Sequence, residues 1–466
     1  MSDATAIIDT TCHEGRASAR TEVAGLGLVE RTIRLADAVD CQRAVVLARP
    51  DDASLVESIR EGLADDSRFP IQIDILEVED PSLSTNIELA SSALTSPEYG
   101  HDCIVYLDSS AAYSRSFVDQ LRERSEPPGN MHVLEPSGFE EGRRTPRLLA
   151  ANWHDWNHLA AIADDTSVDT MEALLSMARG SMNVTTASPA DFEEWVEPIE
   201  DGGDADRAAE RIWQGCHKPV DGPISRHLNR PISLSVSRFL APSNVTPNHM
   251  SAFTFTVGLA ATAAVAVGGF WWFLLGATLY QLSSILDGVD GELARGKYEF
   301  SVAGEWIDSL CDNFKDIFFY IALGWGAYKT VPLDIAGFDA SLWLWFGGLA
   351  ATGKFLSLVG YSIWLIPRGR GCPLLFDWGN DEEEEPESRT LIDEFFARLE
   401  ILGKNDVVLF LAFASAVVGL LPWFLPAVAI GHNIVAFGIA NRLISSETAL
   451  TPEGATETTE SRESII

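Results

Sequence analysis

The most constraining feature of this 466-residue chain is a run of aspartates set between apolar segments long enough to cross a membrane. The run has the spacing D-x2-D-G-x2-A-R-x8-G-x3-D-x3-D, and its fixed positions are Asp287, Asp290, Gly291, Ala294, Arg295, Gly304, Asp308 and Asp312. Carboxylates at membrane depth are costly, so they usually mark an ion or substrate site. The spacing therefore predicts such a site within a membrane domain.

The aspartates predict two neighbouring helices that present four carboxylates to a common point. Asp287 and Asp290 lie three residues apart, so they share one face of a helix. Asp308 and Asp312, four residues apart, do the same on a second helix. Four like charges this close cannot all stay ionised without cations. Hard oxygen ligands favour Mg2+, Mn2+ or Ca2+ over zinc, and four carboxylates can hold two ions that clamp a phosphoryl group in transfer.

All eight fixed positions resemble the signature of the CDP-alcohol phosphotransferase family, also called the CDP-alcohol phosphatidyltransferases. The resemblance implies an integral-membrane, metal-dependent transferase of substituted phosphate groups. Such an enzyme displaces CMP from a CDP-linked alcohol, such as CDP-diacylglycerol, with the hydroxyl of an acceptor alcohol. The resemblance does not name the acceptor, and glycerol phosphate, inositol phosphate, serine and inositol all remain open.

The same resemblance implies a role for each signature residue. The four aspartates would hold Mg2+ or Mn2+, with two ions expected, and Asp312 would also be the general base. Arg295 would contact phosphate or a carboxylate, or else serve only as a helix-end anchor. Lys354, an isolated cation in an apolar segment, would meet an acceptor phosphate or a signature carboxylate, or else form a structural pair. The expected CDP-binding residues are Asp287, Gly291, Ala294, Arg295, Gly304 and Asn248.

Four further polar residues near the apolar segments have structural interpretations. Thr246, in the TPN that precedes the first segment, is expected to cap a helix. Lys315 and Asp316 are expected to pair with each other. His432 is expected to be a hydrogen-bonded interior group rather than a ligand.

The C-terminal half contains about six candidate membrane spans by the criterion of roughly 20 residues. They are Met250–Gly269, Trp271–Val289, Ala303–Thr330, Leu342–Ile366, Val407–Leu421 and Leu425–Ile444. Basic residues concentrate on one side of these spans, which predicts a multi-pass protein of the cell membrane with the N-terminal domain and the signature facing the cytoplasm. Small-residue faces such as Gly347–Gly353 would permit the homodimer that related enzymes form.

Ahead of the spans lies a segment whose basic and apolar residues interleave at helical spacing. Its cations are Lys218, Arg226, Arg230 and Arg238. This pattern predicts a helix lying on an anionic membrane surface, with an ordinary surface helix as the alternative. We assign residues 199–246 to a linker (Glu200–Asp206) and this juxtamembrane helix, 247–446 to the membrane domain and 447–466 to a disordered acidic tail.

The first 198 residues predict a soluble α/β domain, because strand-like and helix-like segments alternate. The expected strands are Thr5–Asp9, Ala44–Ala48, Ile71–Val78 and Cys103–Leu107, and the expected helices are Leu28–Ala38, Ser54–Leu63 and Ser116–Arg124. This alternation favours a mostly parallel sheet.

Two stretches of this domain, Val23–Ala48 and Cys103–Phe117, resemble sugar-nucleotidyltransferases. The loop after the first strand, TTCHEGRASART, is poor in the glycines that let backbone amides surround phosphates. Serine, Ser109 or Ser110, stands at the expected position of the metal-binding aspartate, and only Asp108 lies adjacent to it. We therefore interpret the domain as a degenerate, inactive nucleotidyltransferase. The fusion resembles archaeal and bacterial inositol-phosphate enzymes, which make a CDP-alcohol in one domain and consume it in the other.

The amino-acid composition narrows the range of possible functions. A formal net charge of −35 and a pI near 4.5 argue against nucleic-acid binding and would suit a high-salt cytoplasm. The six scattered cysteines predict reduced thiols with no zinc site. The leading function is the membrane phosphotransferase, with the lipid bilayer, a CDP-alcohol donor and an alcohol acceptor as partners. The alternatives are a bifunctional enzyme with an active N-terminal cytidylyltransferase, a cation transporter that uses intramembrane carboxylates, and a membrane adaptor.

Overall fold

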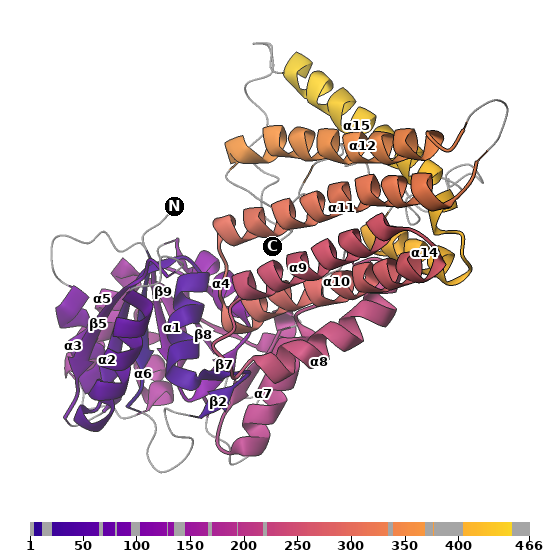
Figure 1. The fold of residues 1–466 in the computed structure, drawn as a ribbon. Coiled ribbons are helices and arrows are strands. Elements are labelled where there is room, and N and C mark those ends of the chain that lie inside the picture. Colours follow the sequence, from indigo (N-terminus) through magenta and orange to yellow (C-terminus); the bar gives the residue numbers. More distant parts are fainter. Residues whose placement is uncertain are drawn as a thin grey trace. The chain divides into compact units, whose positions relative to one another are not determined.

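The computed structural model divides into two compact units, which are described separately (Figure 1). The N-terminal unit comprises Met1–Cys216, Arg238–Asn244 and Leu293–Phe300, and the membrane unit comprises His217–Ser237, Val245–Glu292 and Ser301–Ile466. The structure describes residues 4–11, 21–64, 69–79, 82–94, 103–127, 129–134, 145–165, 170–192, 194–217, 221–333, 339–368, 376 and 404–449. Residues 450–466 of the predicted tail 447–466 and the cation Lys218 lie outside the described residues, and the first three residues of that tail are helical rather than disordered.

A seven-stranded sheet organises the N-terminal unit, in the order β10-β8-β9-β6-β1-β4-β5. The strands are β1 (Ala4–Asp9), β4 (Cys41–Ala48), β5 (Gln72–Glu77), β6 (Cys103–Asp108), β8 (Met131–Leu134), β9 (Leu148–Asn152) and β10 (Val184–Ala187). Strand β1 pairs in parallel with β4 and β6, whereas β9 runs antiparallel to both of its neighbours. The predicted mostly parallel sheet is therefore confirmed.

Helices cover both faces of this sheet (Figure 1). They are α1 (Leu28–Ala38), α2 (Pro50–Ala64), α3 (Leu83–Leu94), α4 (Arg115–Ser125), α5 (Trp153–Asp165) and α6 (Met171–Ala178). Residues of α1, α2 and α4 share a core with Ile8, and residues of α3, α5 and α6 share the opposite core with Ile7. Successive residues of β1 thus face opposite cores, as expected of a strand buried on both sides.

The short remaining elements of this unit lie around the main sheet. The pairs are β2 (Glu22–Val23) with β3 (Leu26–Gly27), and β7 (Ala111–Tyr113) with β11 (Val196–Pro198); a single turn spans Pro189–Phe192. The predicted linker Glu200–Asp206 is wrong, because helix α7 (Gly202–Gln214) begins there. Asp201 and Asp204 form a reciprocal capping box, which turns an apparently flexible acidic stretch into a helix start.

The segment Leu293–Phe300 belongs to the N-terminal unit by its contacts, although it lies far along the chain. The buried Arg31 donates to the Gly296 carbonyl at 3.0 Å, and Arg34 donates to Glu299 Oε1 at 3.1 Å. Tyr298 has a φ of 55°, a left-handed conformation that is uncommon for a bulky side chain. These side-chain hydrogen bonds stabilise the turn that Tyr298 makes.

The membrane unit is entirely helical in the described residues. After the turn at Ser225–Asn229 come α8 (Arg230–Leu240), α9 (Pro247–Val267), α10 (Phe270–Lys297), α11 (Val302–Thr330), α12 (Leu342–Leu365) with a short turn at Ile366–Arg368, α14 (Asn405–Val417) and α15 (Leu421–Ala449). The predicted spans all coincide with these helices. Thr246 caps α9, as predicted, by accepting from the His249 amide.

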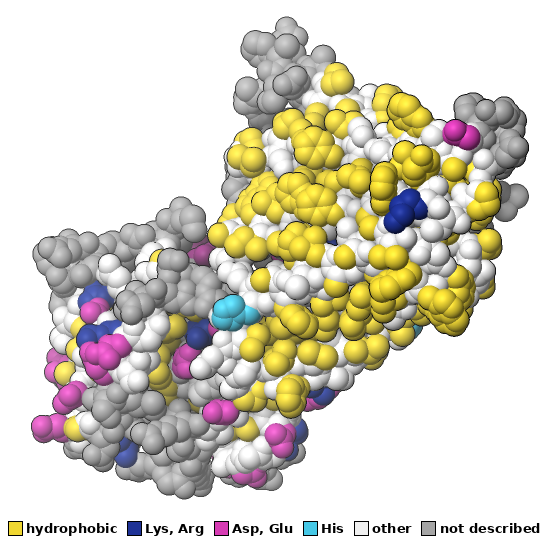
Figure 2. All heavy atoms as spheres, viewed as in Figure 1, with side chains coloured by type: hydrophobic (Ala, Val, Ile, Leu, Met, Phe, Trp, Pro, Cys, Tyr) yellow, Lys and Arg dark blue, Asp and Glu magenta, His cyan; other side chains and the backbone are white. Residues whose placement is uncertain are grey.

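Three of the six predicted spans meet a length-and-apolarity criterion for crossing a membrane: Pro247–Val267, Leu342–Arg368 and Leu421–Ile444. Expecting all six to qualify was wrong. Helix α14 has 13 residues and is too short, and α10 and α11 contain the signature carboxylates and other polar groups that lower their hydropathy. Hydrophobic side chains nevertheless cover the face of this unit seen in Figure 2. Large apolar residues of the unit such as Trp345 and Phe437 are exposed. This surface suits contact with lipid.

Helix α8 forms buried ion pairs and hydrogen bonds with other parts of the protein, whereas a helix that binds a membrane surface would leave its cations exposed to lipid. Arg230 is buried and pairs with Asp221 at 2.8 Å and with the fully buried Glu292 of α10 at 2.8 Å. Glu292 also accepts from Ser233 and Ser237, each at 2.6 Å. Burial alone would lower the pKa of Arg230, but the hydrogen bonds that Arg230 donates to Asp221 and Glu292, and their charges, raise it. Because the Arg230 side chain is buried and paired with two acids of the protein, the prediction that it contacts anionic lipid is wrong.

Small residues let the membrane helices approach closely. A Cβ added to Gly347 of α12 would lie 2.8 Å from the Tyr320 carbonyl of α11, and one added to Gly353 would lie 2.8 Å from the Asn433 amide of α15. The predicted small-residue face Gly347–Gly353 therefore packs largely within the chain. Gly348, on the other side of α12, has open space beside it.

Candidate active site

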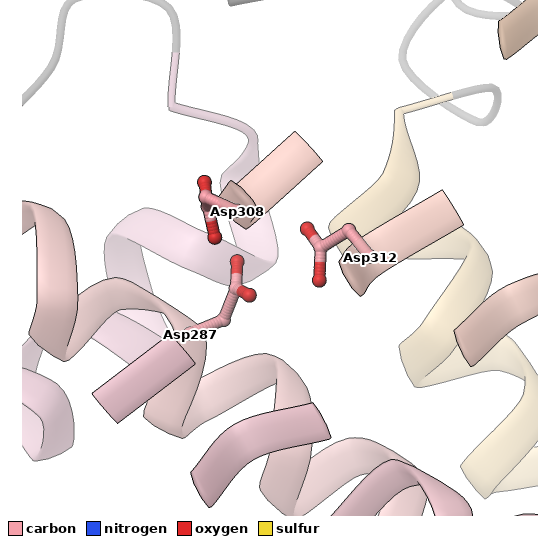
Figure 3. A group of neighbouring side chains, drawn as sticks. All are labelled: Asp287, Asp308 and Asp312. Atoms are coloured by element: carbon pink, nitrogen blue, oxygen red, sulfur yellow. The ribbon is translucent and has the colours of Figure 1, made fainter. Parts of the chain in front are cut away.

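Three signature carboxylates meet at one point between α10 and α11. Asp287 comes from α10 and Asp308 and Asp312 come from successive turns of α11, and Figure 3 shows their carboxylates turned toward a shared space. One oxygen of each lies within 4.8 Å of the others, and all three side chains are half-buried. The Ser301 hydroxyl accepts from the Gly304 amide at 2.9 Å and so helps to set where α11 begins. We call Asp287, Asp308 and Asp312 the carboxylate trio.

The fourth aspartate, Asp290, lies outside this trio. It is 6 % exposed, and its Oδ2 accepts from the Ser251 hydroxyl of α9 at 2.6 Å. Its Oδ1 accepts from the adjacent Gly291 amide. The fourth predicted ligand therefore lies beside the trio, where its side chain contacts Asp308 and is also bonded to the neighbouring helix α9. No pattern in the sequence indicates the contact of Ser251 with Asp290, since a single serine in an apolar segment belongs to no recognisable motif.

A lysine that sequence analysis assigned elsewhere reaches into the trio. Lys315 Nζ lies 2.6 Å from Asp312 Oδ1 and 4.0 Å from Asp287 Oδ1, and its side chain is 3 % exposed. The predicted pairing of Lys315 with Asp316 is wrong, because adjacent residues of a helix point in different directions. The spacing of three between Asp312 and Lys315 was the signal that could have revealed the contact.

The remaining signature positions flank the trio along the same helices. Gly291 follows Asp290 directly, and Ala294 and Arg295 follow one turn later on α10. Asn248 lies at the exposed start of α9, and a Cβ added to Gly304 would lie 3.4 Å from Asn248 Oδ1. The start of α9 and the start of α11 are thus neighbours, as a shared role for Asn248 and Gly304 requires.

Lys354 pairs with an acid outside the signature. Its Nζ lies 2.8 Å from Oδ2 of Asp316, which is fully buried and also accepts from the Tyr280 hydroxyl. The expectation that Lys354 meets a signature carboxylate is therefore wrong, and the structural alternative fits the observed pair. His432 lies 3.1 Å from the Tyr320 hydroxyl, which confirms its predicted place as a hydrogen-bonded interior group.

The N-terminal unit also has two aspartates at the place where open α/β sheets bind ligands. Asp9 and Asp108 end the adjacent parallel strands β1 and β6 and stand side by side in register. Both are fully buried, and their oxygens are occupied by protein donors. Asp9 accepts from Thr11, Tyr106, Asn86 and Arg147, and Asp108 accepts from the Ser110 and Arg147 amides.

These contacts set the ionisation of Asp9. Burial alone would raise its pKa, but hydrogen bonds from Thr11 and Tyr106 and the charge of Arg147 outweigh burial and lower it. Asp9 is therefore a structural anion held by its neighbours.

Comparison with known proteins agrees with the geometry of the membrane unit. Residues 244–369 match the family model of the CDP-alcohol phosphatidyltransferases. The chain is 40% identical over 363 residues to the bifunctional IPC transferase and DIPP synthase of Thermococcus kodakarensis, covering 73% of this chain and 76% of that protein. That alignment is longer than either unit, so the similarity extends into both.

Other relatives match shorter stretches. The protein of the same name from Archaeoglobus fulgidus is 38% identical over 146 residues, which is 31% of this chain and 29% of that protein. The inner membrane protein YnjF of Escherichia coli is 29% identical over 142 residues, covering 30% of this chain and 64% of YnjF. Among solved structures, the inositol-1-phosphate CTP transferase of T. maritima covers 46% of this chain and 98% of its own, at 11% identity and a TM-score of 0.34.

Proposed function

This chain belongs to the CDP-alcohol phosphatidyltransferase family, and we propose that its carboxylate trio is the site of the family's reaction. The enzyme is a membrane CDP-alcohol phosphotransferase, which moves a substituted phosphate from a CDP-linked alcohol to the hydroxyl of an acceptor alcohol. The observation that carries the assignment of the site is the approach of three signature carboxylates from two helices to within 4.8 Å.

The trio suits Mg2+ or Mn2+. Three carboxylate oxygens from a single half-buried cluster form a hard donor set, and such sets favour these ions over softer metals. Asp287, Asp308 and Asp312 would hold the metal together with Asp290, which contacts Asp308 and is oriented by Ser251. A divalent ion bound there supplies charge neutralisation on the transferred phosphoryl group and on the departing CMP.

Within this site Asp312 acts as the general base. Its side chain is 27 % exposed, so an acceptor hydroxyl can reach it. The carboxylate accepts the hydroxyl proton while the acceptor oxygen forms a bond to phosphorus and the bond from phosphorus to CMP breaks. The CDP moiety contacts Asp287, Gly291, Ala294, Arg295, Gly304 and Asn248.

The N-terminal unit does not synthesise the CDP-alcohol. Relatives of this chain carry the name of bifunctional enzymes, which makes an active cytidylyltransferase the alternative. The occupied carboxylates of Asp9 and Asp108 favour inactivity, because buried oxygens that already accept protein hydrogen bonds have little capacity for a metal. The donor is then supplied by another enzyme.

The active site and the N-terminal unit face the cytoplasm, and the enzyme works as a homodimer. The orientation is supported by the basic residues near one set of helix ends, such as Arg295 and Arg368. The dimer is supported by the apolar outer surface of the helices, where Gly348 leaves α12 open to a partner.

The test of the reaction is CMP release by the detergent-purified full chain with Mg2+. CDP-diacylglycerol and CDP-inositol are each offered with glycerol phosphate, inositol phosphate, serine and inositol. Release with one donor and acceptor is expected, and D312N should lower its rate by about 10²–10⁴-fold because the general base is lost. The matched control is D339N, at an exposed aspartate outside the signature, which should leave the rate unchanged.

The same D312N protein separates the two functional alternatives. With the second reaction blocked, it is given CTP and inositol phosphate, and pyrophosphate release is measured. No release above background is expected. Pyrophosphate release at a steady rate would contradict the inactive N-terminal unit and establish the bifunctional alternative.

A further inference from the structure

We propose that the ammonium of Lys315 serves as one of the cations of the carboxylate trio, so that the substrate-free enzyme binds a single divalent ion. This inference rests on the proposed function of the trio as a metal site. It departs from the two ions expected when only the aspartates of the signature are counted.

The position of the ammonium supports this role. Lys315 Nζ is 2.6 Å from Asp312 Oδ1 and 4.0 Å from Asp287 Oδ1, so it contacts members of the trio from both helices. Those two residues also belong to the group whose oxygens lie within 4.8 Å of one another. The ammonium therefore occupies space beside the oxygens that a second divalent ion would use.

The stem of the lysine runs through a slot that the neighbouring helix leaves open for it. A Cβ added to Gly258 of α9 would lie 2.4 Å from Lys315 Cγ and 2.5 Å from Cδ, closer than real atoms approach. With its side chain 3 % exposed, Lys315 has little room to turn away toward solvent. The glycine thus lets the lysine reach the trio and holds its stem there.

The charges of the group agree with one ion. Asp290 contacts Asp308, so the group holds four carboxylates. With one ammonium its formal charge is about −3, which a single divalent ion reduces to about −1 and a second ion would make positive. The other lysine of the helical core, Lys354, is engaged by Asp316 at 2.8 Å. Asp290 also accepts from Ser251 and from the Gly291 amide, which hold it beside Asp308. Without the Lys315 charge the four carboxylates would be left at about −4, a charge that two divalent ions neutralise.

The test is the number of Mn2+ ions bound by the full chain in detergent, without substrate, after removal of metals with a chelator. Electron paramagnetic resonance distinguishes a lone Mn2+ from an exchange-coupled pair, and elemental analysis counts the ions. The wild-type chain is expected to bind one uncoupled ion. K315M, which keeps an unbranched stem over Gly258 but loses the charge, is expected to bind a coupled pair.

Two further variants sharpen the result. G258A should push the lysine stem out of its slot and so also give a coupled pair. K329M is the matched control, because Lys329 is an exposed lysine on the same helix that contacts only backbone carbonyls, and it should bind one ion. A coupled pair in the wild-type chain, or a single ion in K315M, would overturn the proposal.

The failure of this inference is distinguishable from failure of the proposed function. Two ions in the wild-type chain with intact CMP release would overturn the role of Lys315 alone. No bound Mn2+ in the wild-type chain would overturn both. The wild-type count needs no variant, so it remains decisive even when K315M does not fold.

Discussion

Ser251 contacts a signature aspartate without belonging to the signature. Its hydroxyl donates to Asp290 at 2.6 Å from the neighbouring helix α9, and both side chains are buried. A hydrogen bond to a buried carboxylate orients that carboxylate and keeps it from turning toward other partners. The surroundings of the signature aspartates therefore include part of α9 as well as the two helices that contain the signature.

S251A should lower the rate of CMP release about fivefold, the equivalent of about 1 kcal/mol for one lost hydrogen bond. The reason is that Asp290 would keep its charge and lose the donor that orients it. T256A is the control, since Thr256 is exposed on the same helix and its hydroxyl donates to the Ala252 carbonyl of that helix. Equal rates for S251A and the wild-type chain would show that Asp290 needs no such orientation.

The buried Asp9 leads to a prediction about how the stability of the fold changes as the pH is lowered. Its pKa is lowered in the folded protein, so it stabilises the fold above its unfolded pKa of about 3.9, and this stabilisation is lost as pH falls below that value. D9N should therefore lower the melting temperature at neutral pH, and the difference from wild type should shrink below about pH 4. D40N, at an exposed and left-handed position that Asn also tolerates, should match wild type throughout. A difference for D9N that is constant with pH would contradict the ionic role.

At the scale of elements, glycines determine how α12 packs. Gly347 faces the Tyr320 carbonyl of α11, whereas the adjacent Gly348 faces open space. G347A should destabilise the membrane unit by about 1–3 kcal/mol, because overpacking forces the helices apart. G348A should leave stability unchanged or raise it slightly, since alanine is the better helix former. Thermal unfolding in detergent measures both, and equal melting temperatures would contradict the close α11–α12 approach.

The elements were more predictable than their contacts. Helix α1 occupies the predicted Leu28–Ala38, because an apolar stripe at helical spacing depends only on local sequence. Helix α7 was missed, because Asp201 and Asp204 look like a flexible acidic stretch until their reciprocal capping bonds are seen. Membrane spans were over-counted for a related reason, since α10 and α11 are long enough but contain polar groups that their site requires.

The signature predicted which aspartates lie near one another, but it did not predict which other residues each of them contacts. Spacing places Asp287 and Asp290 on one face of α10, yet only packing against α9 decides that Asp290 turns to Ser251. The direction of Lys315 was similarly hidden, because it depends on the absence of a side chain at Gly258, more than fifty residues earlier. Such contacts across helices leave no periodic pattern in the sequence.

At the scale of the whole molecule, the formal charge of −35 predicts a strong response to salt. Raising KCl from about 0.1 M to about 1 M shortens the screening length from about 10 Å to about 3 Å, which weakens repulsion among surface carboxylates. The melting temperature should therefore rise across this range. An uncharged osmolyte at equal osmolality is the control, and an equal rise in that osmolyte would contradict the electrostatic explanation.

The turn between α10 and α11 has a practical consequence for dissecting the protein. The residues Leu293–Phe300 interrupt the signature and take hydrogen bonds from Arg31 and Arg34. A chain shortened to begin after the N-terminal unit would keep every signature residue and still lose the donors that hold this turn. Measurements on the isolated membrane helices would then underestimate the stability and the activity of the full-length enzyme. Because each unit is built from more than one stretch of the chain, no single cut separates the two units.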